Sequence, residues 1–285
     1  MKIIVEFTLG FGETRKKIGE DISKELYCWR RQIKGYKTGK KILSLDFYKM
    51  NEENELYQGI VNFAKRFPEE IALEIYEYYV EYTNEEMNSA VAFIPHFTNN
   101  WCEEYDDTTI EYVECKYCYA CLSVQNEKNY IKPSGFVKTK AEDYGVLRVD
   151  TELNYFLVLP KLYEKLIEEG IPEKYFYPMI SKRNKILAYE LVSDNILPEN
   201  SFKDENYCFR KTCTKCGSKS YEIDENKYVY SPKSISKEGL EALHEVNKTA
   251  EYFHHQQLIM VNKNVHDIIK KYDLTAQFYP VFLEE

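Results

Sequence analysis

The stretch FLVLPKLYEKLIEEGIPEKYFYPM, residues 156–179, aligns without a gap with LIMVNKNVHDIIKKYDLTAQFYPV, residues 258–281. Each stretch starts with an apolar run typical of a strand, continues with the apolar spacing of a helix, and ends in Phe-Tyr-Pro, which we expect to terminate the unit. Two explanations are open. Two strand–helix units can resemble each other by composition alone, or the chain can contain a tandem duplication of a unit of about 100 residues.

Pairs of cysteines extend this alignment toward the N-terminus and favour the duplication. Cys115-Lys-Tyr-Cys118 and Cys213-Thr-Lys-Cys216-Gly217 are offset by 98 residues and precede the two strand–helix units in the same order. A two-residue spacer lets one tight turn present two thiolates to one ion, and structural zinc takes four such ligands in a tetrahedron. We therefore expect a structural zinc bound by Cys115, Cys118, Cys213 and Cys216, which would join the two copies.

Other roles for the cysteines stay open. Cys121 or Cys208 could replace an assigned ligand, and the thiols could belong to a site that has lost its metal. A redox pair would need a thioredoxin-like strand-to-helix context, which neither pair has. A catalytic zinc needs an open position and usually histidine, but the adjacent His254 and His255 would point to opposite faces of a strand. Gly217 suits a turn with positive φ.

Composition and charge limit the classes of protein. The 285 residues are 44% hydrophobic, which is enough for a core, and carry 38 Lys+Arg against 47 Asp+Glu, a net charge of −9. That balance argues against a nucleic-acid partner, because wrapping a phosphate backbone needs a basic face. No apolar run is long enough to span a membrane. The start, MKIIVEFTLG, reaches Glu6 after three apolar residues, so we do not expect it to be a signal peptide. We expect a cytoplasmic protein without a membrane partner.

The acidity is concentrated in residues 51–114, which hold 2 Lys/Arg and 16 Asp/Glu, a net charge of −14. Within this segment Glu103, Glu104, Asp106 and Asp107 form a cluster that is either a solvated loop or part of a protein-binding face. The basic residues 29–41 could contact single-stranded nucleic acid, but a solvated loop that faces the acidic segment is the better interpretation.

The N-terminal part predicts mixed α and β structure. We expect strands at Lys2–Thr8, Lys41–Tyr48 and Ala90–Pro95, and an amphipathic helix at Asn54–Phe67. Residues 70–82 fit either a helix or a strand. The predicted fold class is α+β. It comprises an N-terminal α/β domain at 1–110 and a duplicated zinc-knuckle domain at 111–285, with repeats at about 112–180 and about 208–282.

Two distant Cys-x-x-Cys pairs, the second followed by Gly217 and each followed by a strand–helix unit, resemble the bacterial double-CXXCG-motif proteins. The resemblance covers residues 112–285. Those proteins are grouped with the immunity proteins of polymorphic-toxin systems. The resemblance implies a cytoplasmic inhibitor that binds and neutralises a toxin and uses zinc as a scaffold. A zinc-ribbon regulator that contacts nucleic acid is the alternative. An enzyme is not expected, because we identify no catalytic constellation in the sequence.

Overall fold

The computed structural model describes residues 1–12, 18–95, 101–102, 111–112, 122–123, 145–149, 156–180, 185–223, 232–253 and 256–284. The chain divides into two compact units, Met1–Met87 and Asn88–Glu285. The domain division predicted near residue 110 differs from this one over residues 88–110. Of these residues, Ala92–Pro95 form strand β5, which pairs with two strands from the C-terminal part of the chain.

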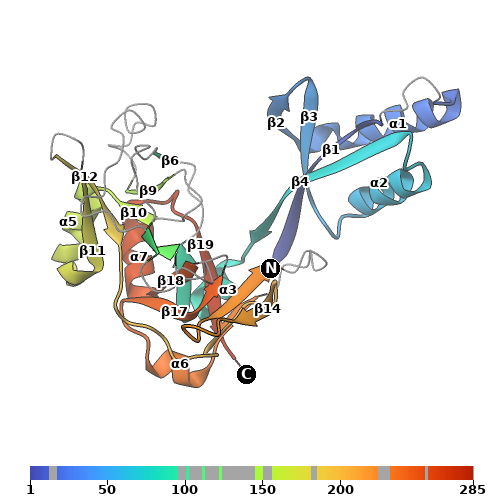
Figure 1. Cartoon of the computed structure of the whole chain (residues 1–285). Coiled ribbons are helices and arrows are strands. Elements are labelled where there is room, and N and C mark those ends of the chain that lie inside the picture. The colour runs from blue at the N-terminus through green and yellow to red at the C-terminus, as the bar shows by residue number, and fades with distance from the viewer. Residues whose placement is uncertain are drawn as a thin grey trace. The chain divides into compact units, whose positions relative to one another are not determined.

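The first unit is a four-stranded antiparallel sheet with two helices on one face (Figure 1). Its strands, in the order β2-β3-β1-β4, are β2 (Lys37–Ile42), β3 (Leu45–Asn51), β1 (Lys2–Phe11) and β4 (Ile71–Glu81). The helices are α1 (Glu20–Gln32), which continues into a short 3-10 helix η2 (Ile33–Tyr36), and α2 (Glu55–Arg66). Alternate residues of β1, such as Phe7, pack with Leu26 of α1 and Phe63 of α2 in one apolar core.

Most of the elements expected in this unit are confirmed. The predicted helix is α2, and the Asn54 side chain caps it by accepting a hydrogen bond of 2.9 Å from the Leu56 N–H. The ambiguous residues 70–82 form strand β4. The single strand predicted at Lys41–Tyr48 is wrong, because the chain reverses at Leu43 and Ser44 between β2 and β3. Neither residue is the glycine or asparagine that usually signals such a turn.

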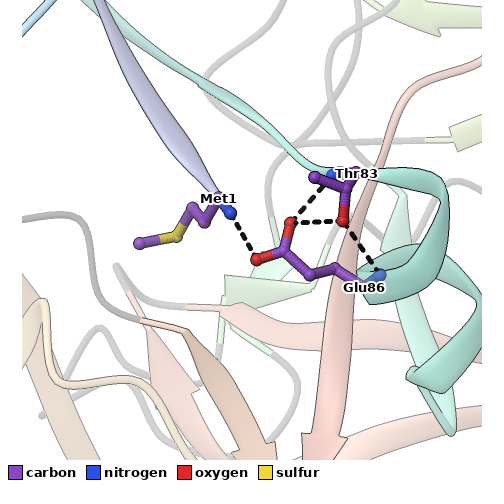
Figure 2. A network of polar contacts seen from close by, with 3 residues as sticks. All are labelled: Met1, Thr83 and Glu86. Carbon is purple, nitrogen blue, oxygen red and sulfur yellow. Dashed lines mark hydrogen bonds and ion pairs between the residues drawn. The ribbon is translucent and has the colours of Figure 1, made fainter.

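Helix α3 (Asn84–Ser89) begins with a capping box. The Thr83 hydroxyl accepts from the Glu86 N–H at 3.2 Å, and the Glu86 carboxylate accepts from the Thr83 N–H at 2.8 Å. Figure 2 shows that the same carboxylate also pairs with the terminal ammonium of Met1. This ammonium and then the Thr83 N–H lower the pKa of Glu86 to about 2. The reciprocal bonds satisfy backbone donors that a helix start leaves without partners.

The second unit contains a five-stranded and an eight-stranded sheet. The first has the order β11-β12-β10-β9-β6, with β11 (Phe176–Ile180), β12 (Ile186–Leu191), β10 (Phe156–Val158), β9 (Val146–Val149) and β6 (Trp101–Cys102). The second has the order β13-β16-β19-β5-β18-β17-β15-β14. Its strands are β13 (Phe202–Lys203), β16 (Lys233–Ile235), β19 (Phe278–Leu283), β5, β18 (Gln256–Asn262), β17 (Val246–Phe253), β15 (Lys219–Ile223) and β14 (Tyr207–Thr212).

Helices connect the strands of both sheets. They are α5 (Pro160–Glu168) and the 3-10 helix η4 (Glu173–Tyr175) after β10, α6 (Lys237–Glu241) after β16, and α7 (Lys263–Tyr272) after β18. A separate two-stranded sheet joins β7 (Glu111–Tyr112) and β8 (Leu122–Ser123). The predicted mixed α+β class is confirmed. Within the described ranges, no helix has both the length and the apolar character needed to cross a membrane.

The two aligned stretches adopt the same arrangement of elements. The first forms β10-α5-β11 and the second forms β18-α7-β19. In both, a third strand lies antiparallel between the two strands of the unit: β12 between β10 and β11, and β5 between β18 and β19. In both, the preceding strand forms a hairpin with the first strand, with Val146 opposite Val158 and Val246 opposite Val261.

The expectation that the Phe-Tyr-Pro tripeptides terminate the two units is wrong. Phe176 and Phe278 are the first residues of β11 and β19. Strand β11 lies at the edge of its sheet, and an edge strand tolerates proline because one of its sides has no ladder hydrogen bonds. The tripeptides therefore mark the start of a strand.

Candidate metal centre

The second cysteine pair lies in the turn of the hairpin formed by β14 and β15 at one end of the eight-stranded sheet. The Cys213 N–H donates to the Ser218 carbonyl at 2.9 Å, and the Gly217 N–H donates to the Cys213 carbonyl at 2.9 Å. Gly217 has φ of 76°, so the expected need for a residue that tolerates positive φ is confirmed. The backbone thus holds both cysteines in one tight turn.

Backbone and side-chain groups surround the two sulfur atoms. Cys213 is buried, and its Sγ accepts a hydrogen bond from the Lys215 N–H at 3.4 Å. Cys216 is exposed, with its Sγ 3.1 Å from the Ser218 hydroxyl. A backbone N–H aimed at a sulfur favours its thiolate form, which is the form that binds metal. The turn therefore has the donor chemistry of half of a four-thiolate zinc site.

The first cysteine pair, Cys115 and Cys118, lies outside the described residues, as does Cys121. The strands on either side of it are described. Glu111 of β7 lies opposite Ser123 of β8. At the 98-residue offset of the cysteine pairs, Glu111 and Ser123 correspond to Phe209 and Tyr221, which lie opposite each other in β14 and β15. The hairpins match at this position but not at the next one. Tyr112 lies opposite Leu122, which corresponds to positions 210 and 220, whereas Ser220 lies opposite Lys211 because the register of β14 shifts between Phe209 and Lys211.

Cys208 does not belong to the turn. It is exposed on β14 and lies opposite Glu222. A strand advances about 3.3 Å per residue, so Cys208 lies about 16 Å from Cys213. Two thiolates that share one zinc must each come within about 2.3 Å of the ion. Cys208 and Cys213 therefore cannot bind the same ion through this hairpin.

The structure does not bring a complete metal centre together in the part that it describes. Among the described residues, no three His, Cys, Asp or Glu side chains form a group that could bind a metal ion. The predicted partner-binding residues Glu103, Glu104, Asp106 and Asp107 also lie outside these residues.

The interpretation of residues 29–41 as a solvated loop facing the acidic segment is wrong. They form the end of α1, η2 and most of β2. Their ion pairs join Lys37 to Asp46 at 2.7 Å and Lys40 to Glu6 at 3.1 Å. Both acidic partners precede residue 51. These lysines therefore pair with carboxylates of residues 1–50, and not with the acidic segment 51–114.

Comparisons with known proteins do not assign the chain to a class. No family model matches it, no curated protein matches it, and no solved structure matches it.

His266 of α7 is a buried titratable group that the sequence analysis did not single out. Its ring stacks on Phe93 of β5, with ring centroids 3.7 Å apart, and its Nδ1 lies 2.8 Å from the Asp267 carboxylate. Its Nε2 is buried and has no hydrogen-bond partner among the described residues. Burial lowers the pKa of His266 below the ordinary 6.5, although the neighbouring Asp267 opposes this shift. The apolar neighbours Val265 and Ile269 are the sequence signal of a buried position.

The stability of the protein should therefore fall as the pH falls below about 6.5, by up to about 1.4 kcal/mol per pH unit from this residue. The unfolded state binds a proton at His266 in that range, whereas the folded state resists binding it. Urea unfolding at several pH values measures the slope. His266→Phe keeps an aromatic ring on Phe93 and should flatten the slope. An unchanged slope in His266→Phe would contradict the assignment.

Proposed function

We propose that this chain is a non-catalytic, cytoplasmic immunity protein that binds and neutralises a bacterial toxin, built on a tandem duplication that a structural zinc joins. The observation that carries the scaffold is the hairpin register. Glu111 pairs with Ser123 as Phe209 pairs with Tyr221, and each hairpin encloses one Cys-x-x-Cys pair. One cross-strand pair thus repeats at the offset of the cysteines, although the next pair is displaced by one residue where the register of β14 shifts. A repeated pair around a repeated motif favours duplicated knuckles over two hairpins that are alike only in composition.

Hydrogen bonds support the duplication independently of the cysteines. The Leu159 N–H donates to the Gly145 carbonyl at 2.9 Å, and the Asn262 N–H donates to the Glu245 carbonyl at 3.0 Å. Each bond lies at the open end of the hairpin that precedes a helix. Leu159 directly precedes α5, and Asn262 directly precedes α7. Composition does not determine where individual backbone bonds form, so the repeated bond favours common ancestry of the two units.

The two aligned repeats, both in the second compact unit, also contact each other. The Asp273 carboxylate after α7 accepts from the Gly145 and Val146 N–H groups, at 3.1 and 3.0 Å. In the opposite direction, the Tyr175 hydroxyl after α5 donates to the Glu245 carboxylate at 3.0 Å. Asp273, which follows α7, thus binds the start of β9. Tyr175, which follows α5, binds Glu245, the residue before β17. This reciprocity suits a scaffold of two similar halves.

Cys115, Cys118, Cys213 and Cys216 would bind the zinc. Bound zinc would supply a cross-link between the two knuckles and no reaction chemistry, because four protein ligands leave no open position. The metal would hold the halves together while another surface binds the toxin.

Toxin binding is proposed from the resemblance to double-CXXCG-motif proteins and from the charge of residues 51–114. A concentrated acidic surface accelerates association with a basic partner and makes it sensitive to salt. Glu103, Glu104, Asp106 and Asp107 are the proposed contact residues within that segment.

A growth assay tests the function. We expect a neighbouring gene to encode the toxin. Its toxin domain, expressed alone in a host cell, should arrest growth, and co-expression of this chain should restore growth. Reversal of the charges at Glu103, Glu104, Asp106 and Asp107 should slow association of the purified proteins by about tenfold at low salt. The control reverses the charges of Glu238 and Glu241, exposed residues of α6, and should leave association unchanged.

Two outcomes would overturn the proposal. Growth that stays arrested when the folded chain is present would remove the immunity function. Salt-sensitive binding of the chain to generic DNA or RNA, together with no binding to the toxin, would instead support the nucleic-acid regulator.

A further inference from the structure

The turn between β2 and β3 carries a leucine where the backbone favours a different residue. Leu43 has φ of 47° and Ser44 has φ of 67°. Two consecutive residues with positive φ between paired antiparallel strands define a type I′ turn, for which asparagine and glycine are strongly preferred. Leucine is disfavoured in this region because its Cβ crowds the backbone. A residue kept in an unfavourable conformation points to a function for its side chain.

The Leu43 side chain is 90% exposed, although it is apolar. Two more aliphatic side chains flank it, because Ile42 and Leu45 lie opposite each other at the ends of β2 and β3 and are 48% and 37% exposed. The hairpin of β2 and β3 lies at the edge of the sheet (Figure 1). Its tip carries three exposed aliphatic side chains.

Four lysines precede this tip in the sequence. All of them are exposed, and they are Lys34, Lys37, Lys40 and Lys41. Two of them take part in the ion pairs with Asp46 and Glu6 described above. Lys34 and Lys41 form no ion pair within 4.0 Å of any residue that the structure describes, although Lys41 lies opposite Asp46 and, after the hydrogen bond from Lys37, its charge helps to lower the pKa of that carboxyl group. From the body of the unit outward, the hairpin therefore carries cationic groups first and aliphatic groups at its end.

We propose that the β2–β3 hairpin docks on an anionic phospholipid surface, with its aliphatic tip below the headgroups and its lysines among them. The order of groups along the hairpin matches the order of layers in such a surface, where negative headgroups cover hydrocarbon. One partner then contacts both the exposed apolar side chains and the exposed lysines.

Other partners match the hairpin less well. Single-stranded nucleic acid is bound by stacking bases on aromatic side chains, whereas the tip is aliphatic. A protein partner would need an apolar pocket that accepts three aliphatic side chains and an acidic rim around it. The expectation of no membrane partner rested on the lack of a spanning segment. A surface hairpin spans nothing, and its docking goes beyond the proposed immunity function and does not depend on it.

Sedimentation of the full, metal-loaded chain with vesicles tests the proposal. The probes are vesicles of phosphatidylglycerol and phosphatidylcholine in equal parts and vesicles of phosphatidylcholine alone. The chain should sediment with the first in low salt and not with the second. Leu43→Asn should weaken this binding about tenfold, which corresponds to the burial of one leucine side chain. Lys41→Glu should weaken it as well.

Matched variants separate docking from folding. Leu274 is also an exposed leucine, 81% exposed in the second unit, and Leu274→Asn should leave vesicle binding unchanged. Asparagine fits positive φ, so Leu43→Asn should melt at the same temperature as the wild type or higher. Equal loss of binding in both leucine variants, no binding of the wild type to anionic vesicles, or binding to duplex DNA in place of vesicles would each overturn the proposal.

Discussion

Replacement of Cys213 by serine should release the proposed zinc and lower the melting temperature more than any other single change considered. The sulfur of Cys213 is buried and oriented by the Lys215 N–H, and serine offers zinc a far weaker ligand. Structural zinc sites contribute on the order of 10 kcal/mol in apparent values for small metallodomains. Loss of one of four thiolates should forfeit a large part of that contribution. Metal content by mass spectrometry and thermal melting of the untagged chain measure the two effects.

Cys208→Ser is the matched control for this prediction. It changes a cysteine of the same hairpin that is exposed and, by strand geometry, too far from the turn to share its ion. It should keep one zinc per chain and the wild-type melting temperature. Cys115→Ser should behave like Cys213→Ser if the first pair completes the site. A wild-type chain without zinc, or zinc that survives both Cys213→Ser and Cys115→Ser, would contradict the paired knuckles.

A buried ion pair in the second unit should give the second largest effect. The Asp204 carboxylate lies 2.6 Å from the Lys233 ammonium, and their side chains are 1% and 7% exposed. The other carboxylate oxygen accepts from the Asn206 N–H at 3.0 Å, and the ammonium lies over the Tyr279 ring, 4.7 Å from its centroid. The pair connects the turn after β13 to β16, in a part of the sheet with only short strands.

Asp204→Ala should lower the free energy of unfolding by about 3–5 kcal/mol, because it removes a carboxylate that lies 2.6 Å from a buried ammonium. The double variant Asp204→Leu with Lys233→Met should recover most of this loss, since it buries no charge. Urea unfolding measures both. Lys219→Ala breaks a more exposed ion pair, with Glu199 at 2.9 Å, and should cost at most about 1 kcal/mol. A similar loss in Asp204→Ala and Lys219→Ala would contradict the special role of the buried pair.

The sequence predicted those elements whose signals are local. Helix α2 follows from its apolar spacing and from Asn54, which caps it through a bond to Leu56. The turn at Cys213–Gly217 follows from the glycine and the two-residue spacer, since its hydrogen bonds join residues at most five apart. The strand and the helix of each aligned stretch were predicted because they lie in one continuous stretch of chain, whereas the strand that follows each helix was not.

Where the local signal was missing or misleading, the prediction failed. The β2–β3 turn was not recognised because Leu43 and Ser44 continue the alternating pattern of a strand, and only pairing of Ile42 with Leu45 reverses the chain. The Phe-Tyr-Pro tripeptides suggested an end, yet both begin strands, because a neighbouring strand pairs with them.

The sequence alone determined the α+β class, the repeated units and the turn that holds the second cysteine pair, because these depend on interactions between residues near each other in the chain. Only the tertiary structure decided that β5 fills the place between β18 and β19 that β12 fills between β10 and β11. It also decided that His266 and the pair of Asp204 and Lys233 are buried. The physical reason is that strand order and burial depend on which distant apolar surfaces cover each other, and no local periodicity records that choice.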